Sequence, residues 1–425
     1  MRPVFFLALI CFNTSLLFGQ NNSSDVNVRN DRVKTVQLTK EDWNLSYPII
    51  KLNSNEKLKL QFDILSDQAE SFYYTFVHCD KDWNNSNIFI GDYLEGFEEN
   101  PLDDYKSSFN TTVSYYHYSL VFPNERAGLK LSGNYLILVY EPGKKDDPVL
   151  TCRFIVTENA GSIEAIAQRP RMAGDNYQTH QQIDFTYNYS GIGLNDPFRN
   201  IYASILQNGK WGTSKNNLKA DFQGNNDLKY SSLSDKVTFP GGNEFRYFDI
   251  KSIRYKSENV RDVEFLMSNY NVFLQPSDNR EFKPYFYSKD INGKYIIAYQ
   301  EGQDPETDAD YVFVYFTLPG KEINGGEIYV SGAFNNWRLD SANKMFYNPL
   351  ANQYESTILL KQGWYNYEYV FLKKGDQIET REPFEGNHFE TENDYIILIY
   401  YRNPRERFDR VLCTKTVNTL NNIKD

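Results

Sequence analysis

The side chains best able to do chemistry lie together in residues 74–84, which read YTFVHCDKDWN. There the thiol of Cys79 directly follows the imidazole of His78, and a thiol activated by a histidine is the usual nucleophile of a cysteine hydrolase. Neighbouring side chains of a strand point to opposite faces, so His78 and Cys79 cannot readily meet. A dyad would need His117 from another strand, where no glycine-rich oxyanion loop is near. We therefore expect no catalytic residue, and Cys79 to be a small core side chain.

The carboxylates that follow this strand also suggest a metal site, which the sequence does not otherwise support. Asp80 and Asp82 stand where the strand should end, and carboxylates at such a place are usually turn formers. The segment lacks the repeated oxygen ligands and the glycine of a dedicated calcium loop. The chain has four histidines, none spaced with another His or Cys as a zinc site requires. We expect no metal and no cofactor.

The N-terminus has the composition of a secretory signal peptide. An apolar block from Val4 to Cys11 precedes a small residue, Gly19, and a polar run that begins at Gln20. No later segment approaches the roughly 18 consecutive apolar residues of a membrane span. The formal net charge of −11 argues against nucleic acid and anionic membrane surfaces, which attract basic patches. We expect residues 1–19 to be removed and the mature chain to be exported, with a protein or a neutral ligand as partner.

Three cysteines remain after this signal: Cys79, Cys152 and Cys413. An odd number in an exported chain allows at most one disulfide, so the protein is not a disulfide-built scaffold. Cys79 and Cys152 each lie on an apolar strand face, as buried cysteines do. If the two strands are neighbours, a Cys79–Cys152 disulfide could form in an oxidising compartment.

The hydrophobic pattern predicts an all-β fold. Residues 57–65 and 182–189 alternate apolar and polar side chains, as half-buried strands do. Residues 135–140, 311–318 and 395–401 are continuous apolar runs, which fit strands covered on both faces. Tyr and Phe, 33 and 30 residues respectively, are abundant, and aromatic rings pack well on a pleated surface. Many short strands with frequent turn signals are typical of β-sandwiches.

Two shifts in composition predict domain boundaries. Residues 158–177 mix Gly, Pro and charge, and residues 300–310 form an acidic segment. We therefore divide the mature chain into three consecutive β-sandwich domains of immunoglobulin-like or E-set-like type, at residues 20–158, 159–300 and 301–425.

The third of these domains resembles the glycogen- and starch-binding E-set modules. Residues 327–337 (EIYVSGAFNNW) match their Gly-x-Phe-x-x-Trp turn, and residues 363–371 match their Gly-x-Tyr-x-Tyr-x-Phe strand. The family's binding aromatic corresponds to Trp337. The usual lysine between the strand aromatics is Glu368 here. The modules also have an Asp-Gly turn that carries a second tryptophan, and residues 373–376 of this chain stand in its place. The resemblance supports the fold more than the function.

A longer series of motifs runs through the first two domains. In order, these motifs are LKLQFD (58–63), YTFVHCDKDWN (74–84), YLEGF (93–97), SSFNT (107–111), YYHY (115–118), FPN (122–124), SGNY (132–135), QRPR (168–171) and IDF (183–185). The series resembles the type 9 secretion system plug protein family. With the E-set-like third domain, the resemblance covers nearly the whole mature chain.

The resemblance implies a non-enzymatic, periplasmic protein, monomeric by itself. Its partner would be the very large outer-membrane translocon barrel, beneath which it docks, closing the periplasmic opening while no cargo is engaged. The segment after the first-domain strand then supplies candidate translocon contacts: Asp80, Lys81, Asp82, Trp83 and Asn84. For Trp83 we expect packing rather than contact, because tryptophan is mostly buried in folded proteins.

Two alternatives come from other functional classes. A carbohydrate-binding accessory protein would use Trp337 and Trp364 of the third domain as stacking platforms for sugar rings. A hydrolase would use Cys79 and His117, and would require that thiol to be accessible.

Overall fold

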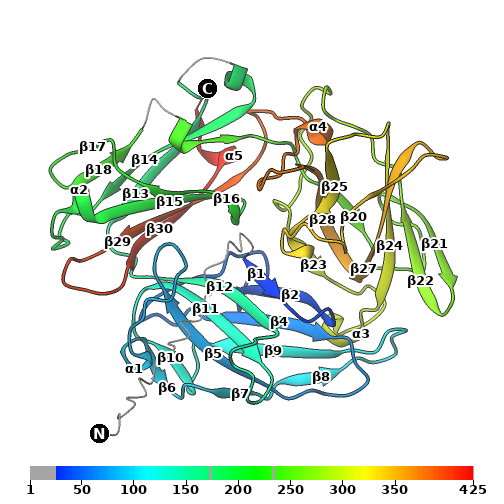
Figure 1. The fold of residues 1–425 in the computed structure, drawn as a ribbon, viewed down its shortest axis with the longest axis horizontal. Coiled ribbons are helices and arrows are strands. Elements are labelled where there is room, and N and C mark those ends of the chain that lie inside the picture. Colours follow the sequence, from blue (N-terminus) through cyan, green and yellow to red (C-terminus); the bar gives the residue numbers. More distant parts are fainter. Residues whose placement is uncertain (1–24, 172–174, 232–234, 425) are drawn as a thin grey trace, which may run out of the picture.

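The computed structural model describes residues 25–171, 175–231 and 235–424 and is built almost entirely of strands (Figure 1). Strand accounts for 47% of it and helix for 7%, which confirms the predicted all-β class. The predicted signal peptide, residues 1–19, lies outside the described residues. No helix in the described part of the chain is long and apolar enough to span a membrane. Figure 1 shows three lobes around a common centre, and each lobe is a sandwich of mainly antiparallel strands.

The first sandwich unit contains β1 to β12. One sheet has the order β1 (Val26–Val28), β12 (Leu150–Thr157), β11 (Gly133–Tyr140), β5 (Phe72–Cys79) and β7 (Asn100–Leu102), with β3 (Ile49–Lys51) parallel to β12. The other has the order β2 (Val33–Lys40), β4 (Leu58–Ile64), β9 (Tyr116–Phe122) and β8 (Tyr105–Ser107). A separate pair, β6 (Leu94–Gly96) and β10 (Ala127–Leu129), follows α1 (Ile90–Tyr93). The predicted alternation is present in β4, whose apolar side chains are buried in the first core.

The second sandwich unit combines β13 to β19 with the last strands of the chain. One sheet has the order β17 (Phe222–Gln223), β18 (Asp227–Tyr230), β14 (His180–Asn188), β13 (Ser162–Gln168) and β31 (Ile423–Lys424), with β19 (Thr238–Pro240) on β14. The other has the order β16 (Lys210–Leu218), β15 (Ile201–Gln207), β29 (Asp394–Tyr401) and β30 (Arg410–Asn418). The short helices of this unit are η1 (Asp175–Gln178), α2 (Pro197–Asn200), η2 (Asp235–Val237) and α5 (Thr419–Asn422).

The third sandwich unit lies between these two parts of the second. One sheet has the order β20 (Arg246–Asp249), β28 (Gly363–Lys373) and β23 (Tyr295–Ile297), with β25 (Gly326–Ser331) also on β28. The other has the order β21 (Val260–Leu266), β22 (Asn269–Leu274), β24 (Tyr311–Pro319), β27 (Gln353–Lys361) and β26 (Phe346–Asn348). The short helices are α3 (Pro305–Asp308), η3 (Ala333–Asn335) and α4 (Glu382–Glu385).

This topology differs from the predicted boundary between residues 300 and 301. The strand β29 pairs along its whole length with β15, and its side chains Tyr395, Ile397 and Ile399 lie in the second core. Composition detects local breaks, whereas this pairing joins segments almost 200 residues apart. We propose that the second domain is discontinuous and that the third is inserted into it, at about residues 244–386.

A buried carboxylate joins the first unit to the third. Asp63 of β4 accepts hydrogen bonds from His117 Nδ1 on β9, and from Lys361 Nζ and the Tyr311 hydroxyl of the third unit, each at 2.7 Å. The side chains of Asp63 and Lys361 are each 1% exposed. Burial alone would raise the pKa of Asp63, but Lys361 and His117 hold that pKa below its ordinary value. The strand alternation placed Asp63 on the polar face of β4, and the third unit covers that face.

A second carboxylate, at the start of α3, extends this junction. Glu306 Oε1 accepts hydrogen bonds from Lys59 Nζ and from Gln61 Nε2, both on β4, at 2.7 Å. Burial alone would raise the pKa of Glu306, but the Lys59 hydrogen bond and nearby His117 hold that pKa at about 2. The junction therefore depends on ionised carboxylates.

Removing the Lys361 ammonium should strongly destabilise the protein. Lys361→Met leaves the Asp63 carboxylate buried without its main counter-charge, which costs about 3–5 kcal/mol when a buried pair is broken. The free energy of unfolding from urea titration measures this loss. Arg29→Met is the matched control, because the Arg29–Asp147 pair is exposed and should contribute at most about 1 kcal/mol. Equal losses in the two variants would contradict the assigned role of Asp63.

Acid should weaken the same junction. A carboxylate whose pKa is lower in the folded state stabilises that state above its unfolded pKa, and this contribution is lost as the pH falls towards the folded pKa. For Asp63 and Glu306 we expect the free energy of unfolding to decrease between about pH 5 and pH 2. Glu306→Gln should make that decrease shallower, as measured by urea titration at a series of pH values. The same slope in both proteins would count against the assignment.

Candidate functional site

The structure separates the two residues of the hypothetical dyad. Cys79 ends β5 in one sheet of the first unit, and His117 lies on β9 in the other. His117 is bound to Asp63, as described above, and burial raises the pKa of the Cys79 thiol to about 12. Burial also lowers the pKa of His78 to about 4, and its ring is hydrogen-bonded to Ser86 and to the Ser132 carbonyl. The arrangement offers no activated thiolate.

The condition for a Cys79–Cys152 disulfide, that the two strands are neighbours, is not met. Cys79 on β5 pairs with Asn134 of β11, and Cys152 on β12 pairs with Ile137 of the same strand. The strand β11 therefore lies between the two cysteines, and they are also offset along it. Cys79, Cys152 and Cys413 are all free and buried.

The loop after Cys79 is folded by the first of its two carboxylates. Asp80 Oδ1 accepts hydrogen bonds from the backbone N–H groups of Asp82 and Asn84, both at 2.9 Å. This is the turn-forming use of a carboxylate that the sequence suggested. The Lys81 N–H donates to Asp409 at 2.9 Å, and Asp82 accepts from Asn217 at 2.8 Å, so the loop is tied to the second unit.

Trp83 packs between the first two units. Its backbone is left-handed, with φ of 67°. The ring centroid lies 4.9 Å from that of Trp211 on β16, in an edge-to-face arrangement, and the Arg153 guanidinium lies 4.5 Å from the Trp83 ring. Of the five candidate contact residues, the exposed side chains are Asp82 and Asn84.

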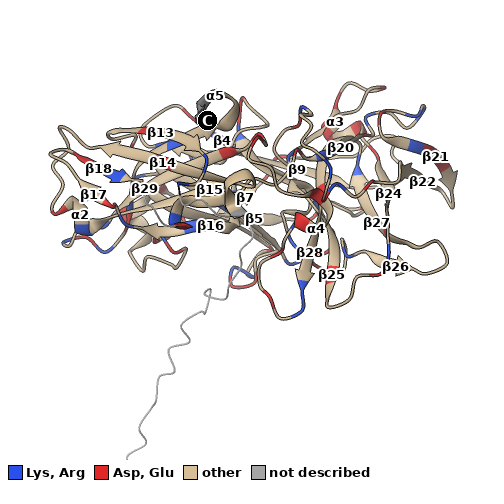
Figure 2. Ribbon diagram, turned by 90° about the horizontal axis from the view of Figure 1, so that it is seen from above, with Lys and Arg blue, Asp and Glu red and all other residues tan. Residues whose placement is uncertain are grey.

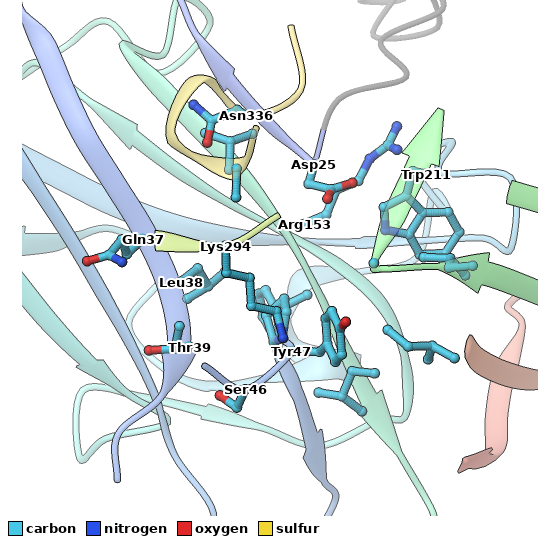
Figure 3. Close-up of a pocket in the computed structure, with 18 of the residues that line it drawn as sticks. Asp25, Gln37, Leu38, Thr39, Ser46, Tyr47, Arg153, Trp211, Lys294 and Asn336 are labelled. Atoms are coloured by element: carbon cyan, nitrogen blue, oxygen red, sulfur yellow. The ribbon is translucent and has the colours of Figure 1, made fainter. Parts of the chain in front are cut away.

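A cavity of about 150 Å³ lies where the three units meet (Figure 3). Its walls include side chains from all of them: Tyr47 and Ile155 of the first unit, Leu206 and Leu398 of the second, and Lys294 and Trp337 of the third. Sequence reasoning missed this site, because its residues are far apart in the chain and share no motif. Only the packing of the units brings them together.

Two charged groups in this cavity have unusual pKa values. Burial raises the pKa of Asp25 to about 7, although nearby Arg153 opposes this. Burial also lowers the pKa of Lys294 to about 8, although Asp394 opposes this. Within the described chain, Asp25 Oδ1 and Trp83 Nε1 are buried without a hydrogen-bond partner. Such groups mark places where a ligand or water can be held.

The two tryptophans proposed for sugar binding have different surroundings. The Lys210 ammonium of the second unit lies 3.8 Å from the Trp337 ring centroid, and Lys210 Nζ also contacts Glu368 Oε1 at 2.5 Å. The residue that replaces the lysine of the sugar-binding modules therefore holds the second unit against the third, and Lys210 covers one face of Trp337. Trp364 stacks on Tyr247 at 5.4 Å between ring centroids.

Shortening Trp83 should loosen the junction between the first two units. Because Trp83 is half-buried, we expect Trp83→Ala to lower the free energy of unfolding by about 2 kcal/mol, less than a fully buried aromatic ring would. Trp43→Ala is the control, since that side chain is 60% exposed and should change stability by at most about 0.5 kcal/mol. Urea titration followed by circular dichroism measures both. Equal stability of Trp83→Ala and the wild type would exclude the packing role.

Comparison of structures finds a full-length relative. A hypothetical protein from Parabacteroides merdae ATCC 43184, with a crystal structure at 2.30 Å resolution, is 33% identical in sequence, with a TM-score of 0.89. The match covers 93% of this chain and 99% of that one. The BSP domain of a biofilm associated protein also aligns over 92% of this chain and 59% of its own, but at 8% identity and a TM-score of 0.17 it carries no argument. No curated protein matches the sequence.

The first unit identifies the family. Residues 33–158 match the model of the type 9 secretion system plug protein first domain. This range runs from the start of β2 to just beyond β12, so it spans nearly all of the first sandwich, including the loop 80–84. The chain belongs to the type 9 secretion system plug protein family.

Proposed function

We propose that this protein is a periplasmic plug that docks at the periplasmic opening of the type 9 secretion translocon and seals it while no cargo is engaged. The family match, over most of the first unit, is the observation that carries this proposal. It indicates a role in type 9 secretion. Docking beneath the outer-membrane barrel and sealing are the parts that we add.

The packing of the three units supports such a role, because a plug must keep its shape against a pore mouth. Each pair of units is joined by buried or partly buried polar contacts. Asp63 joins the first and third units, and Lys210 and Glu368, both almost fully buried, join the second and third. Between the first and second, the Tyr400 hydroxyl donates to Asn134 at 2.9 Å. Contacts of this kind fix one arrangement.

An exposed aromatic loop of the third unit is the docking element that we propose. Phe282 is 89% exposed and Phe286 is 80% exposed, although large apolar side chains are normally withdrawn from water. In protein complexes, aromatic side chains at such positions often supply most of the binding energy. In Figure 2, acidic and basic residues are interspersed over the elements, so charge marks the docking surface less clearly than this loop does.

Two side chains of this loop, Arg280 and Tyr285, anchor it through partly buried polar contacts. Arg280 Nε donates to Glu385 Oε2 at 2.8 Å, and the Tyr285 hydroxyl donates to Glu244 Oε1 at 2.5 Å. Glu385 also accepts from Arg246, so that one buried carboxylate binds two guanidinium groups. A preorganised loop loses little conformational entropy on binding. Asp82 and Asn84 of the first unit are the second set of proposed contacts.

Affinity purification from the native envelope tests both parts of the proposal. The tagged wild type should recover a very large outer-membrane barrel in near-stoichiometric amount. The double variant Phe282→Ser and Phe286→Ser should recover it at least about tenfold less, with an unchanged melting temperature. The matched control is Phe346→Ser with Leu350→Ser, which should leave recovery unchanged. Both side chains are exposed, Phe346 on β26 and Leu350 in the turn that follows it.

The outcomes separate the two claims. If the wild type recovers no barrel under conditions that preserve other envelope complexes, the docking proposal is wrong. If the wild type and the loop variant recover equal amounts, docking stands and the aromatic loop is not its anchor.

A further inference from the structure

The residues that line the central cavity do not include those of the proposed docking loop. The cavity is lined by residues of all three sandwich units, so an occupant could contact each of them (Figure 3). Its volume of about 150 Å³ is enough for one benzene-sized ring, since apolar cavities of that size bind such molecules.

Much of the cavity wall is apolar. The apolar side chains include Leu38 and Ile155 of the first unit and Leu206, Ile396 and Leu398 of the second. Trp337 adds an aromatic surface from the third unit. A wall of this kind favours a flat or branched hydrocarbon body over a fully polar ligand such as a sugar.

The Lys294 ammonium adds one positively charged group to this wall. The Lys294 ammonium donates to the Leu45 carbonyl at 2.6 Å and lies 3.7 Å from the Tyr47 ring centroid, and it forms no ion pair with any described carboxylate. An ammonium has three donors and is costly to bury without a counter-charge. Figure 3 shows Lys294 alongside Tyr47, between Leu38 and Ser46.

The other charges near the cavity leave this ammonium without a direct partner. The Asp394 carboxylate accepts from the Tyr47 hydroxyl at 2.9 Å and from Asn418 at 3.0 Å, so its hydrogen bonds go to those residues. The Asp25 carboxylate also lines the cavity, and it interacts electrostatically with Arg153, while burial raises its pKa to about 7. The Trp83 N–H, which has no described partner, adds a further donor that an anionic oxygen could satisfy.

We propose that this cavity is a binding site for a small organic carboxylate with an apolar body. Lys294 holds the carboxylate, and the apolar wall of the second unit holds the body. Because Lys294, Leu398 and Tyr47 belong to three different units, the ligand binds only where all of them are assembled. Binding therefore stabilises the assembled body, as any ligand specific for the folded state does. The proposal does not depend on docking to the translocon.

Sodium benzoate is the probe, and benzamide, a neutral molecule of nearly the same shape, is the control ligand. Isothermal titration of the full mature chain, at constant ionic strength adjusted with sodium chloride, should show saturable benzoate binding with one site. Benzamide should bind at least about tenfold more weakly, because it lacks the charge that Lys294 requires. Benzoate should also raise the melting temperature, and benzamide at the same concentration should raise it less.

The variant Lys294→Met tests the anchoring residue, because methionine keeps the apolar stem and removes the charge. It should abolish the preference for benzoate over benzamide. Lys283→Met is the matched control, since Lys283 pairs with Asp278 on the outside of the third unit and should leave benzoate binding unchanged. Circular dichroism and the melting temperature report whether each variant is folded.

Three results would overturn the proposal. They are the absence of saturable benzoate binding to the wild type, equal affinities for benzoate and benzamide, and full benzoate affinity in a folded Lys294→Met variant. The comparison of the two ligands on the wild type decides the question even if Lys294→Met does not fold. A crystal grown with benzoate would then show whether the bound carboxylate lies at Lys294.

Discussion

The ionised carboxylate of Asp63 is the constraint on which the arrangement of the units depends. A carboxylate withdrawn from water must be paired and hydrogen-bonded, and Asp63 meets this requirement only with groups from two units. His117 comes from the first unit, whereas Lys361 and Tyr311 come from the third. If the third unit moved away, the Asp63 carboxylate would lose its hydrogen bonds to Lys361 and Tyr311. The ion pair therefore specifies orientation, and apolar burial supplies most of the stability.

The apolar strand β29 joins the second unit to the first. Its residues Tyr395, Ile397 and Ile399 lie in the core of the second unit, and the alternate residues Ile396 and Leu398 lie in a cluster with Ile155 of the first. Because both faces are covered, the strand has none of the polar alternation of a half-exposed strand. The hydrophobic residues at this junction therefore belong to the same strand that fills the core of the second unit.

Local pattern predicted much of the fold and little of the site. Alternation at residues 57–65 predicted β4, and the position of Asp80 at a strand end predicted its turn-forming role, because both depend on neighbours in sequence. The same reasoning could not predict that a whole unit would cover Asp63. Whether the strands of Cys79 and Cys152 are neighbours could not be predicted either, because the strand order, which puts β11 between them, is set by distant pairing. The central cavity exists only after three units have assembled, so no sequence window contains it.

The discontinuous second domain that we propose has a consequence for the folding of the chain. Its strand β15 appears long before β29, the partner beside which it must lie, so the first part of this sandwich has an open edge until the C-terminal strands arrive. The inserted third unit brings the two parts of the second unit close together, because its own ends are adjacent. The His388 N–H donates to the Gly242 carbonyl at 2.8 Å. Once the third unit has folded, it closes a loop of more than 140 residues and removes most of the entropy that would oppose pairing of β15 with β29. The folded third unit therefore holds β15 and β29 close enough in space to pair.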